Sequence, residues 1–352
     1  MVSSTGIQTC ESGDFQGCIQ PLPFSIYNRD SSQLLKSFPT NCIDLVYLDP
    51  PFFSNRDYWI NSSTSQRFAF SDRWRRGLDS YCKWMKEIAV ECERILKNGG
   101  SLYLHCDTHA SHYLKVVLDE VFGVANFHNE IVWKRQSAHN DWTQGAKSYG
   151  RIHDVILYYS KGPGYTWNPV FEPFSEAHVR RAYRHVESGT GRRYSLGDLT
   201  GPGGASKGNP RYKFLGVERY WRYSKERMKK LYQEGRIIQR KPGNVPLLKR
   251  YLDEMNGRPI QDVWDDISSA KTAHEKTGYP TQKPLRLVRR IIQVSSKPGD
   301  IILDPFCGSG SSLVASYETQ RRWIGIDNSR TACSIALRRL RRAGEINAKI
   351  IG

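Results

Sequence analysis

The sequence predicts an α/β fold in which a mostly parallel sheet carries functional residues at the carboxyl ends of its strands. Two stretches lead to this prediction. The apolar run Ile43–Leu48 stops at Asp49-Pro50-Pro51-Phe52, and Asp300–Asp304 runs into a glycine-rich turn that ends at Gly310. A strand must stop at consecutive prolines because proline cannot donate to a β-ladder. In open α/β sheets ligands bind at this carboxyl edge.

The first stretch has the groups needed to hold an exocyclic amine. The Asp49 carboxylate and the Pro50 carbonyl can accept its two N–H bonds, while the Phe52 ring stacks on the base. Pro51 completes the rigid turn. Alone, such a short motif is equally compatible with a plain turn.

The second stretch is typical of a turn that lets backbone approach a ligand closely. Gly308 and Gly310 bend the chain, and the segment from Ser311 onward is expected to be helical, with its N–H groups facing the ligand. The strand Trp323–Asp327 then ends in an acid, at the spacing at which α/β folds place a carboxylate on a ribose. The full dinucleotide-binding glycine pattern is absent.

Together with Tyr279–Pro284, these two stretches resemble the amino-methylating DNA methyltransferases that use S-adenosylmethionine. The catalytic motif comes first and the cofactor motif last, as in the permuted β-group of that family. The resemblance covers roughly residues 25–340. It implies a Rossmann-like methyltransferase fold with a mostly parallel seven-stranded sheet, a circularly permuted motif order and an inserted target-recognition domain.

The resemblance also implies roles for individual residues. Asp49, Pro50, Pro51 and Phe52 would form the catalytic motif. The cofactor would be S-adenosylmethionine, with the Asp304–Gly310 turn at its methionine portion, Asp327 at its ribose, and Thr281 and Lys283 at its carboxylate end. The cofactor-binding residues are thus expected to be Asp304, Phe306, Gly308, Gly310, Asp327, Thr281 and Lys283. Tyr279 stands where the family commonly has histidine, and no metal is expected.

The expected reaction is methylation of adenine N6 in a base flipped out of duplex DNA. Asp before the proline pair is the usual adenine variant of the family, whereas serine is the usual cytosine variant. Cytosine-N4 methylation stays open as an alternative, as do an RNA methyltransferase and a non-catalytic DNA-binding protein of the same fold. The motif order argues against enzymes that modify RNA or protein glutamine.

Composition predicts a nucleic-acid partner and one strongly basic segment. The chain has 52 Lys and Arg against 35 Asp and Glu, a net charge of +17. Residues 163–250 alone have 19 Lys and Arg against 7 Asp and Glu, interleaved with twelve aromatic residues. We therefore predict an N-terminal arm (1–24), a catalytic half (25–162), a target-recognition insertion (163–271) and a cofactor-binding half (272–352). A basic insertion with a small core of its own explains the same composition.

Double-stranded DNA is accordingly the expected partner, and association with a membrane is not expected. No apolar run approaches the ~20 residues of a membrane-spanning helix, and Met1–Gly6 lacks the features of a secretory signal. We expect a cytoplasmic protein of bacterial, archaeal or phage origin, linked to restriction-modification. The sequence leaves open whether it is a monomer or homodimer and whether a cognate restriction endonuclease exists.

Periodicity predicts most of the remaining elements. The helix over 81–96 should be capped by Asp79 or Ser80 and ended by Gly99-Gly100, and Ser224 should cap the helix over 225–234. Further helices are expected over 108–122, 285–295 and 329–343, and strands over 101–107, 127–134 and 153–159.

Four further features need the structure to decide them. Residues 53–71 show neither the helical nor the strand period, and we interpret them as a lid loop beside the site, with a disordered segment as the alternative. His105 reads as a satisfied structural histidine, and Asp107 as a residue that could support the target pocket. The acidic patch 262–267 is expected to be solvated or to pair with the basic insertion.

Overall fold

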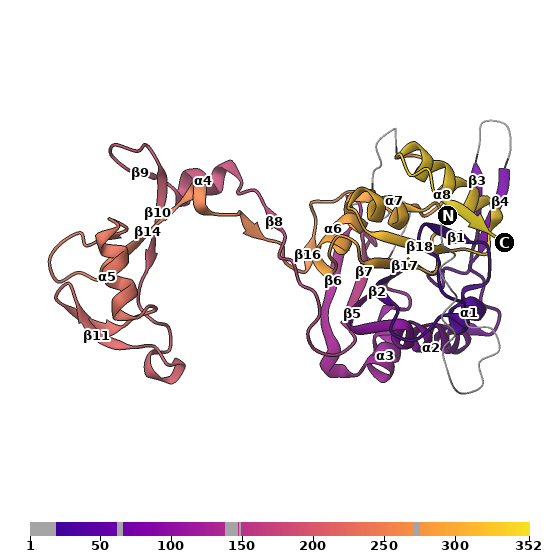
Figure 1. The fold of residues 1–352 in the computed structure, drawn as a ribbon, viewed down its shortest axis with the longest axis horizontal. Helices are drawn as coiled ribbons and strands as arrows, with labels where there is room; N and C mark the ends of the chain where they lie inside the picture. Colours follow the sequence, from indigo (N-terminus) through magenta and orange to yellow (C-terminus); the bar gives the residue numbers. More distant parts are fainter. Residues whose placement is uncertain (1–18, 62–65, 138–146, 148, 270–274) are drawn as a thin grey trace, which may run out of the picture. The chain divides into compact units, whose positions relative to one another are not determined.

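The computed structural model describes residues 19–61, 66–137, 147, 149–269 and 275–352. They form two compact units (Figure 1). The first unit comprises the chain up to Val170 together with Gln261–Gly352, and the second comprises Phe171–Ile260.

A nine-stranded sheet forms the centre of the first unit, in the order β16-β6-β7-β5-β2-β17-β18-β1-β19. All neighbouring pairs are parallel except the two that involve β7. The predicted number of seven strands is too low, because short strands are added at both edges. The strands are β1 Ser25–Tyr27, β2 Ile43–Leu48, β5 Leu96–Cys106, β6 Phe127–Lys134, β7 His153–Ser160, β16 Val263–Trp264, β17 Ile301–Asp304, β18 Arg322–Ile326 and β19 Lys349–Ile351.

The two strands that carry the catalytic and cofactor motifs are direct neighbours at the centre of this sheet. β2 pairs in parallel with β17, and Leu45 and Val46 lie opposite Ile302 and Leu303. Strands this central are covered on both faces, which explains why β2 is almost continuously apolar. Parallel pairing in this register brings the ends of β2 and β17 to the same edge of the sheet.

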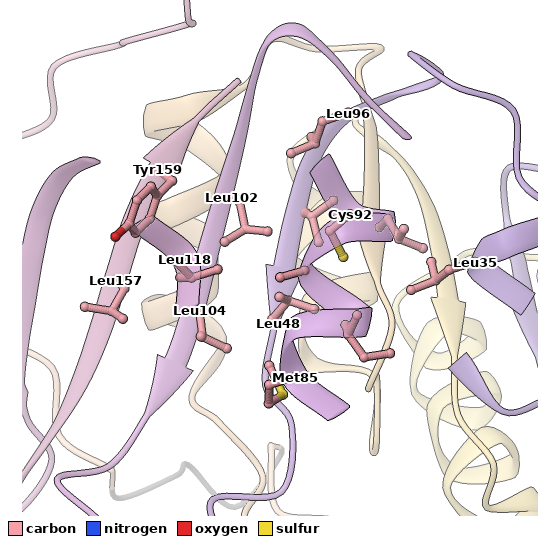
Figure 2. Close-up of a cluster of buried hydrophobic side chains, with 14 of the residues drawn as sticks. Leu35, Leu48, Met85, Cys92, Leu96, Leu102, Leu104, Leu118, Leu157 and Tyr159 are labelled. Atoms are coloured by element: carbon pink, nitrogen blue, oxygen red, sulfur yellow. The ribbon is translucent and has the colours of Figure 1, made fainter. Parts of the chain in front are cut away.

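Helices cover the two faces of the sheet as separate groups (Figure 1). Alternate β2 residues, among them Val46 and Leu48, face the large core beneath α2 and α3, where Met85 lies near Leu48 (Figure 2). A second core joins β1 and β18 to α7 and α8. The helices are α1 Ser31–Leu34, α2 Gly77–Ile95, α3 Ser111–Phe122, α6 Leu285–Ser295, α7 Ser311–Glu318 and α8 Arg330–Arg342, and no described helix is long and apolar enough to cross a bilayer.

The predicted capping of α2 is wrong. The helix begins at Gly77, ahead of both proposed caps, and Arg76 at its N-cap makes no side-chain capping bond. Leu78 in the first turn packs against the large core, so tertiary burial outweighs local capping. Gly99 and Gly100 lie within β5, because the strand begins directly after the helix.

Within the expected loop 53–71, residues 57–61 and 66–71 form two paired strands. β3 Asp57–Asn61 pairs antiparallel with β4 Gln66–Ser71. The register shifts between Tyr58 and Trp59, and such a bulge breaks the alternation from which a strand is recognised. The lid role of this segment stays a prediction.

The second unit has a small core of its own. Trp221, Met228 and Leu231 are buried there together with Leu199, Phe214, Ile237 and Leu248. Its elements are β8 Phe171–Glu172, α4 Glu176–Ala182, β9 His185–Val186, β10 Arg193–Asp198, β11 Arg211–Phe214, β12 Val217–Tyr220, α5 Lys225–Gln233, β13 Ile237–Ile238, β14 Leu247–Tyr251 and β15 Arg258–Pro259, with short 3-10 turns at Gly204–Lys207 and Leu252–Glu254. Ser224 caps α5 as predicted.

The compact second unit is shorter than the predicted insertion 163–271. Asn168 is tied to α6, with its backbone N–H donating to the Val294 carbonyl at 2.8 Å. On the return, β16 pairs with β6 of the central sheet. The acidic patch also belongs here. Asp262 and Asp265 are exposed, which confirms the expected solvation, whereas Asp266 pairs with Arg290 and Arg286 of α6 and not with the basic insertion.

Candidate active site

The catalytic and cofactor motifs open into one cavity of about 610 Å³ at the carboxyl edge of the sheet. This confirms that the two motifs, far apart in the sequence, meet at neighbouring strand ends. Ten of the eleven predicted site residues line the cavity: Asp49, Pro50, Pro51, Phe52, Thr281, Lys283, Asp304, Phe306, Gly308 and Asp327.

Gly310 is the predicted site residue that does not line the cavity. It precedes α7 in a left-handed conformation with φ +76°. A Cβ atom there would lie 2.7 Å from the Cβ of Ala336 in α8. Gly310 therefore lets α7 and α8 pack closely, and its predicted contact with the cofactor stays a prediction.

Asp304 is a buried carboxyl at the end of β17. It accepts a hydrogen bond from the Phe306 N–H at 2.9 Å, and its other oxygen is bonded to the Ser312 hydroxyl. Burial raises the pKa of Asp304 to about 7, and the nearby charges of Asp49 and Asp327 act in the same direction. Near neutral pH this group can therefore exchange a proton when a charged ligand arrives.

Asp327, at the end of β18, organises the glycine-rich turn. Its two carboxylate oxygens accept backbone N–H bonds from Gly308 at 2.9 Å and from Ser329 at 2.8 Å. Burial raises the pKa of Asp327 to about 6, although these two bonds oppose the rise. Gly308 has φ +49°, and a Cβ atom there would approach the Tyr279 ring to 3.2 Å.

The Asp49 carboxylate is held by Lys283. The Nζ of Lys283 lies 2.6 and 2.8 Å from the two Asp49 oxygens, and the Asp49 and Lys283 side chains are only 18% and 8% exposed. The same ammonium lies 4.7 Å from the centre of the Phe52 ring. Lys283 thus contacts both functional side chains of the catalytic motif, a pairing that the sequence did not indicate.

His105 packs against Phe52, with 5.3 Å between ring centres. It is fully buried, and its nitrogens lie 3.1 Å from the Tyr47 hydroxyl and 3.2 Å from Asp154. The prediction of a satisfied histidine is confirmed. Asp107 is engaged instead with His109, and it does not line the cavity.

The hairpin supplies an aromatic wall that sequence reasoning missed. Tyr58, Phe68 and Phe70 line the cavity, and the Tyr58 and Phe70 rings stack with centres 4.7 Å apart. Phe70 in turn stacks near Tyr279 at 6.4 Å. Phe68 and Phe70 are two residues apart, a spacing that places both rings on one face of a strand, and this was the sequence signal for the wall.

Asp72, directly after the hairpin, was also missed. Although it borders the cavity, it is 1% exposed, and its carboxylate receives hydrogen bonds from the backbone that follows Pro51. Its neighbours in sequence, Ser71 and Arg73, gave no indication of this role.

The sequence profile of the DNA methylase family matches residues 43–338. The chain belongs to the DNA methylase family. M.EcaI of Enterobacter cloacae, a Type II methyltransferase, is 33% identical to this methylase over 302 residues, which are 84% of this chain and 64% of that relative. The chain thus spans less than two thirds of M.EcaI. YhdJ of Escherichia coli (strain K12), a DNA adenine methyltransferase, is 26% identical over 326 residues, 92% of this chain and 85% of the relative.

A solved structure shares the fold. TTHA0409 of Thermus thermophilus, assigned as a DNA modification methylase, superposes with a TM-score of 0.51 and 16% identity, covering 94% of this chain and all of that chain. This similarity supports a Rossmann-like methyltransferase architecture for the first unit.

Proposed function

We propose that this methylase transfers a methyl group from S-adenosylmethionine to the N6 amine of an adenine flipped out of duplex DNA. The observation that carries the proposal is the shared cavity between the Asp49–Phe52 motif and the Asp304–Gly310 turn. A methyl donor and an acceptor amine must meet in one place, and this cavity joins the two motifs expected to hold them.

The residues present fit the proposed cofactor. A cavity of about 610 Å³ lies within the ~300–1,000 Å³ range of small-molecule sites. Asp304 and Asp327 offer carboxylates to the cationic and hydroxyl groups of the cofactor, and Gly308 leaves its backbone approachable. When bound, S-adenosylmethionine supplies a methyl group that is already activated on a sulfonium.

The catalytic motif would position the target amine. The Asp49 carboxylate and the Pro50 carbonyl accept the two N–H bonds of the amine, which localises the nitrogen lone pair. Phe52 stacks on the extruded base. Stacking of a base on an aromatic ring contributes ~1–3 kcal/mol, which offsets part of the free-energy cost of flipping the base out of the duplex. Lys283 donates to both Asp49 oxygens, and each oxygen has a further lone pair that can accept from the amine.

Adenine is favoured over cytosine as the target base. Asp49 precedes the proline pair, as is usual for adenine enzymes of the resembled family, and the relative YhdJ is named as an adenine methyltransferase. Cytosine-N4 methylation is the alternative.

The second unit would recognise the DNA sequence. The 163–250 stretch that contains most of it has a surplus of 12 basic over acidic residues, 19 against 7. The unit has its own core, so it can display basic side chains on a stable scaffold, among them Lys225, Arg227, Lys229 and Lys230 on α5. Action in the cytoplasm stays a prediction from the sequence. Whether the protein is a monomer or homodimer, and whether a cognate restriction endonuclease exists, stays open.

The decisive experiment combines methyl transfer with mapping of the product. The purified protein is incubated with labelled S-adenosylmethionine and, in parallel, duplex DNA, RNA or protein, and DNA from expressing cells is mapped by long-read sequencing. We expect label on duplex DNA and N6-methyladenine at one recognition sequence. Asp49→Ala should abolish transfer, whereas Asp49→Asn retains an acceptor oxygen and should keep a fraction of it.

Three results would contradict the proposal. Label on cytosine N4 would support the alternative base, and label on RNA or protein another substrate class. DNA binding without any transfer would support a non-catalytic protein.

A further inference from the structure

Asp72 is a buried carboxylate that accepts five hydrogen bonds. Its Oδ2 accepts from the backbone N–H of Phe52 at 3.1 Å, from the backbone N–H of Ser54 at 2.6 Å and from the Ser54 hydroxyl at 2.6 Å. Its Oδ1 accepts from the backbone N–H of Phe53 at 3.0 Å and from the Trp74 indole at 2.9 Å. Both oxygens are therefore engaged by the protein itself.

The backbone that Asp72 holds is in an unfavourable conformation. Phe53 has a φ angle of +64°, a left-handed conformation that a phenylalanine rarely adopts unless its surroundings enforce it. Successive N–H groups turned toward one point form a concave site that favours an anion. Charge-assisted hydrogen bonds from these N–H groups to the Asp72 carboxylate stabilise this turn.

A chain of aromatic contacts extends this arrangement to the cofactor turn. Trp74 lies 5.2 Å from Trp84, and Trp84 lies 5.5 Å from Phe306, measured between ring centres. Trp84 and Phe306 both line the cavity. Trp74 also packs against the Tyr81 ring, with 4.9 Å between ring centres, and the Tyr81 hydroxyl donates to the Pro51 carbonyl at 2.8 Å.

We propose that Asp72 is the positioning residue of the catalytic motif. It fixes the backbone of residues 52–54, and through it the Phe52 ring and the preceding Asp49. It also ties this turn to the end of the β3–β4 hairpin, whose aromatic residues face the same cavity. The inference rests on the proposed methyl transfer and adds to it a residue that acts on rate through geometry.

This role predicts a specific kinetic signature. The five hydrogen bonds of Asp72 all go to residues 52–54 and Trp74, and Trp74 reaches Phe306 of the cofactor turn through Trp84. Loss of Asp72 should therefore lower the rate of methyl transfer far more than the affinity for S-adenosylmethionine. A misplacement of reacting groups by about 1 Å can cost on the order of 100-fold in rate. The single-turnover rate of methyl transfer should fall by about this factor in Asp72→Asn, in which an amide replaces one acceptor oxygen with a donor that faces N–H groups.

The test compares Asp72→Asn with Ser54→Ala and with the control Asp266→Asn. Ser54→Ala removes the hydroxyl that donates to Asp72 and accepts from the Tyr58 hydroxyl at 3.0 Å. It leaves the other four hydrogen bonds of Asp72 in place and should show a smaller loss of rate. Asp266→Asn weakens ion pairs with Arg286 and Arg290 away from the cavity, so it lowers thermal stability but should keep the wild-type rate. Rates are measured well below the unfolding temperature of each variant, with cofactor affinity measured by calorimetry.

Wild-type rates in Asp72→Asn would overturn the inference. It would equally be overturned if the Asp72 variant lost cofactor affinity in proportion to rate, or if Asp266→Asn lost as much rate. Absence of transfer by the wild-type protein is a separate outcome, which would refute the proposed function itself.

Discussion

The pair formed by Asp49 and Lys283 shows how strongly a single contact can couple two distant motifs. The two residues are 234 positions apart, yet both Asp49 oxygens receive bonds from one ammonium. Because both side chains are largely shielded from water, their attraction is weakened little by solvent. The pair holds the catalytic motif against the Tyr279–Pro284 segment.

We therefore predict a measurable coupling free energy between Asp49 and Lys283. A double-mutant cycle with Asp49→Ala and Lys283→Ala, followed by chemical denaturation, should give a coupling of about 1–3 kcal/mol. The Lys86 and Glu120 pair is the control, because its side chains are 50% and 54% exposed and exposed pairs contribute only ~0–1 kcal/mol. Equal coupling in the two cycles would contradict the prediction.

Asp304 gives stability a pH dependence of unusual sign. Its folded pKa of about 7 exceeds the ordinary value of ~3.9, so between these values the native state binds more protons than the unfolded state. The free energy of unfolding should therefore decrease as pH rises from about 4 to about 7. Asp304→Asn should reduce this decrease, as measured by ligand-free denaturation at several pH values. A decrease as steep in the variant as in the wild type would show that Asp304 is not its source.

Site residues could be predicted from the sequence where a proline after an apolar run marked the end of a strand. Asp49 and Asp304 each stand between an apolar run and a proline, and strand ends of this kind are visible without a structure. Asp72 has no such mark. Its function depends on the folding of a hairpin that returns the chain to Phe52, which no local pattern encodes.

At the scale of elements, the contact between α7 and α8 depends on Gly310. Substitution by alanine adds the cost of a left-handed residue, ~1–2 kcal/mol, and a clash with Ala336. Overpacking of this kind typically costs ~1–3 kcal/mol more. Gly310→Ala should therefore destabilise the protein by the sum of both effects, measured by chemical denaturation.

Gly299→Ala separates the two effects. Gly299 has φ +88°, but a Cβ atom there meets nothing within 4 Å. It should show the conformational cost alone, and Ala336→Gly in the Gly310→Ala background should restore part of the stability. Equal losses of stability in Gly310→Ala and Gly299→Ala would mean that the added methyl group at Gly310 does not disturb the packing of α7 against α8.

Helices and strands whose apolar residues repeat with an unbroken spacing could be predicted, whereas those in which this spacing is broken could not. α6 was predicted over residues 285–295 as observed, because its apolar residues follow the helical repeat and Pro284 marks its start. The β3–β4 hairpin was missed because its bulge at Tyr58 and Trp59 shifts the alternation. The cap of α2 was wrong because burial of Leu78 extends the helix backwards.

At the scale of the whole molecule, charge is concentrated where the proposed DNA contacts lie. Neutralising the four exposed basic residues of α5 should make DNA binding less salt-dependent, since each lost phosphate contact lowers the slope of log K against log[salt] by ~0.9. The change is Lys225, Arg227, Lys229 and Lys230 to glutamine, and the measurement is affinity across a salt series.

A matched set on α8 controls for net charge. Arg330, Arg338, Arg341 and Arg342 are also exposed and carry the same total charge. The sequence predicts that they form a solvated face, so their replacement should leave the slope unchanged. A slope that falls equally for both sets would assign the effect to overall charge.

The limits of the second unit could not be predicted from composition. Residues 163–170 have the glycine and aromatic content of the basic segment, but Asn168 ties them to α6. The edge strands of the sheet were likewise hidden, because β16 has two residues and is recognisable only through its partner β6.

The second unit begins and ends in a single pair of short strands. β8 and β15 lie side by side, and Gly257 is required there because a Cβ atom would come within 2.1 Å of the Glu172 carbonyl oxygen. The chain thus enters and leaves the second unit through one antiparallel strand pair. We therefore expect that the residues between β8 and β15 can be lengthened, shortened or exchanged while the order of strands in the central sheet stays as it is.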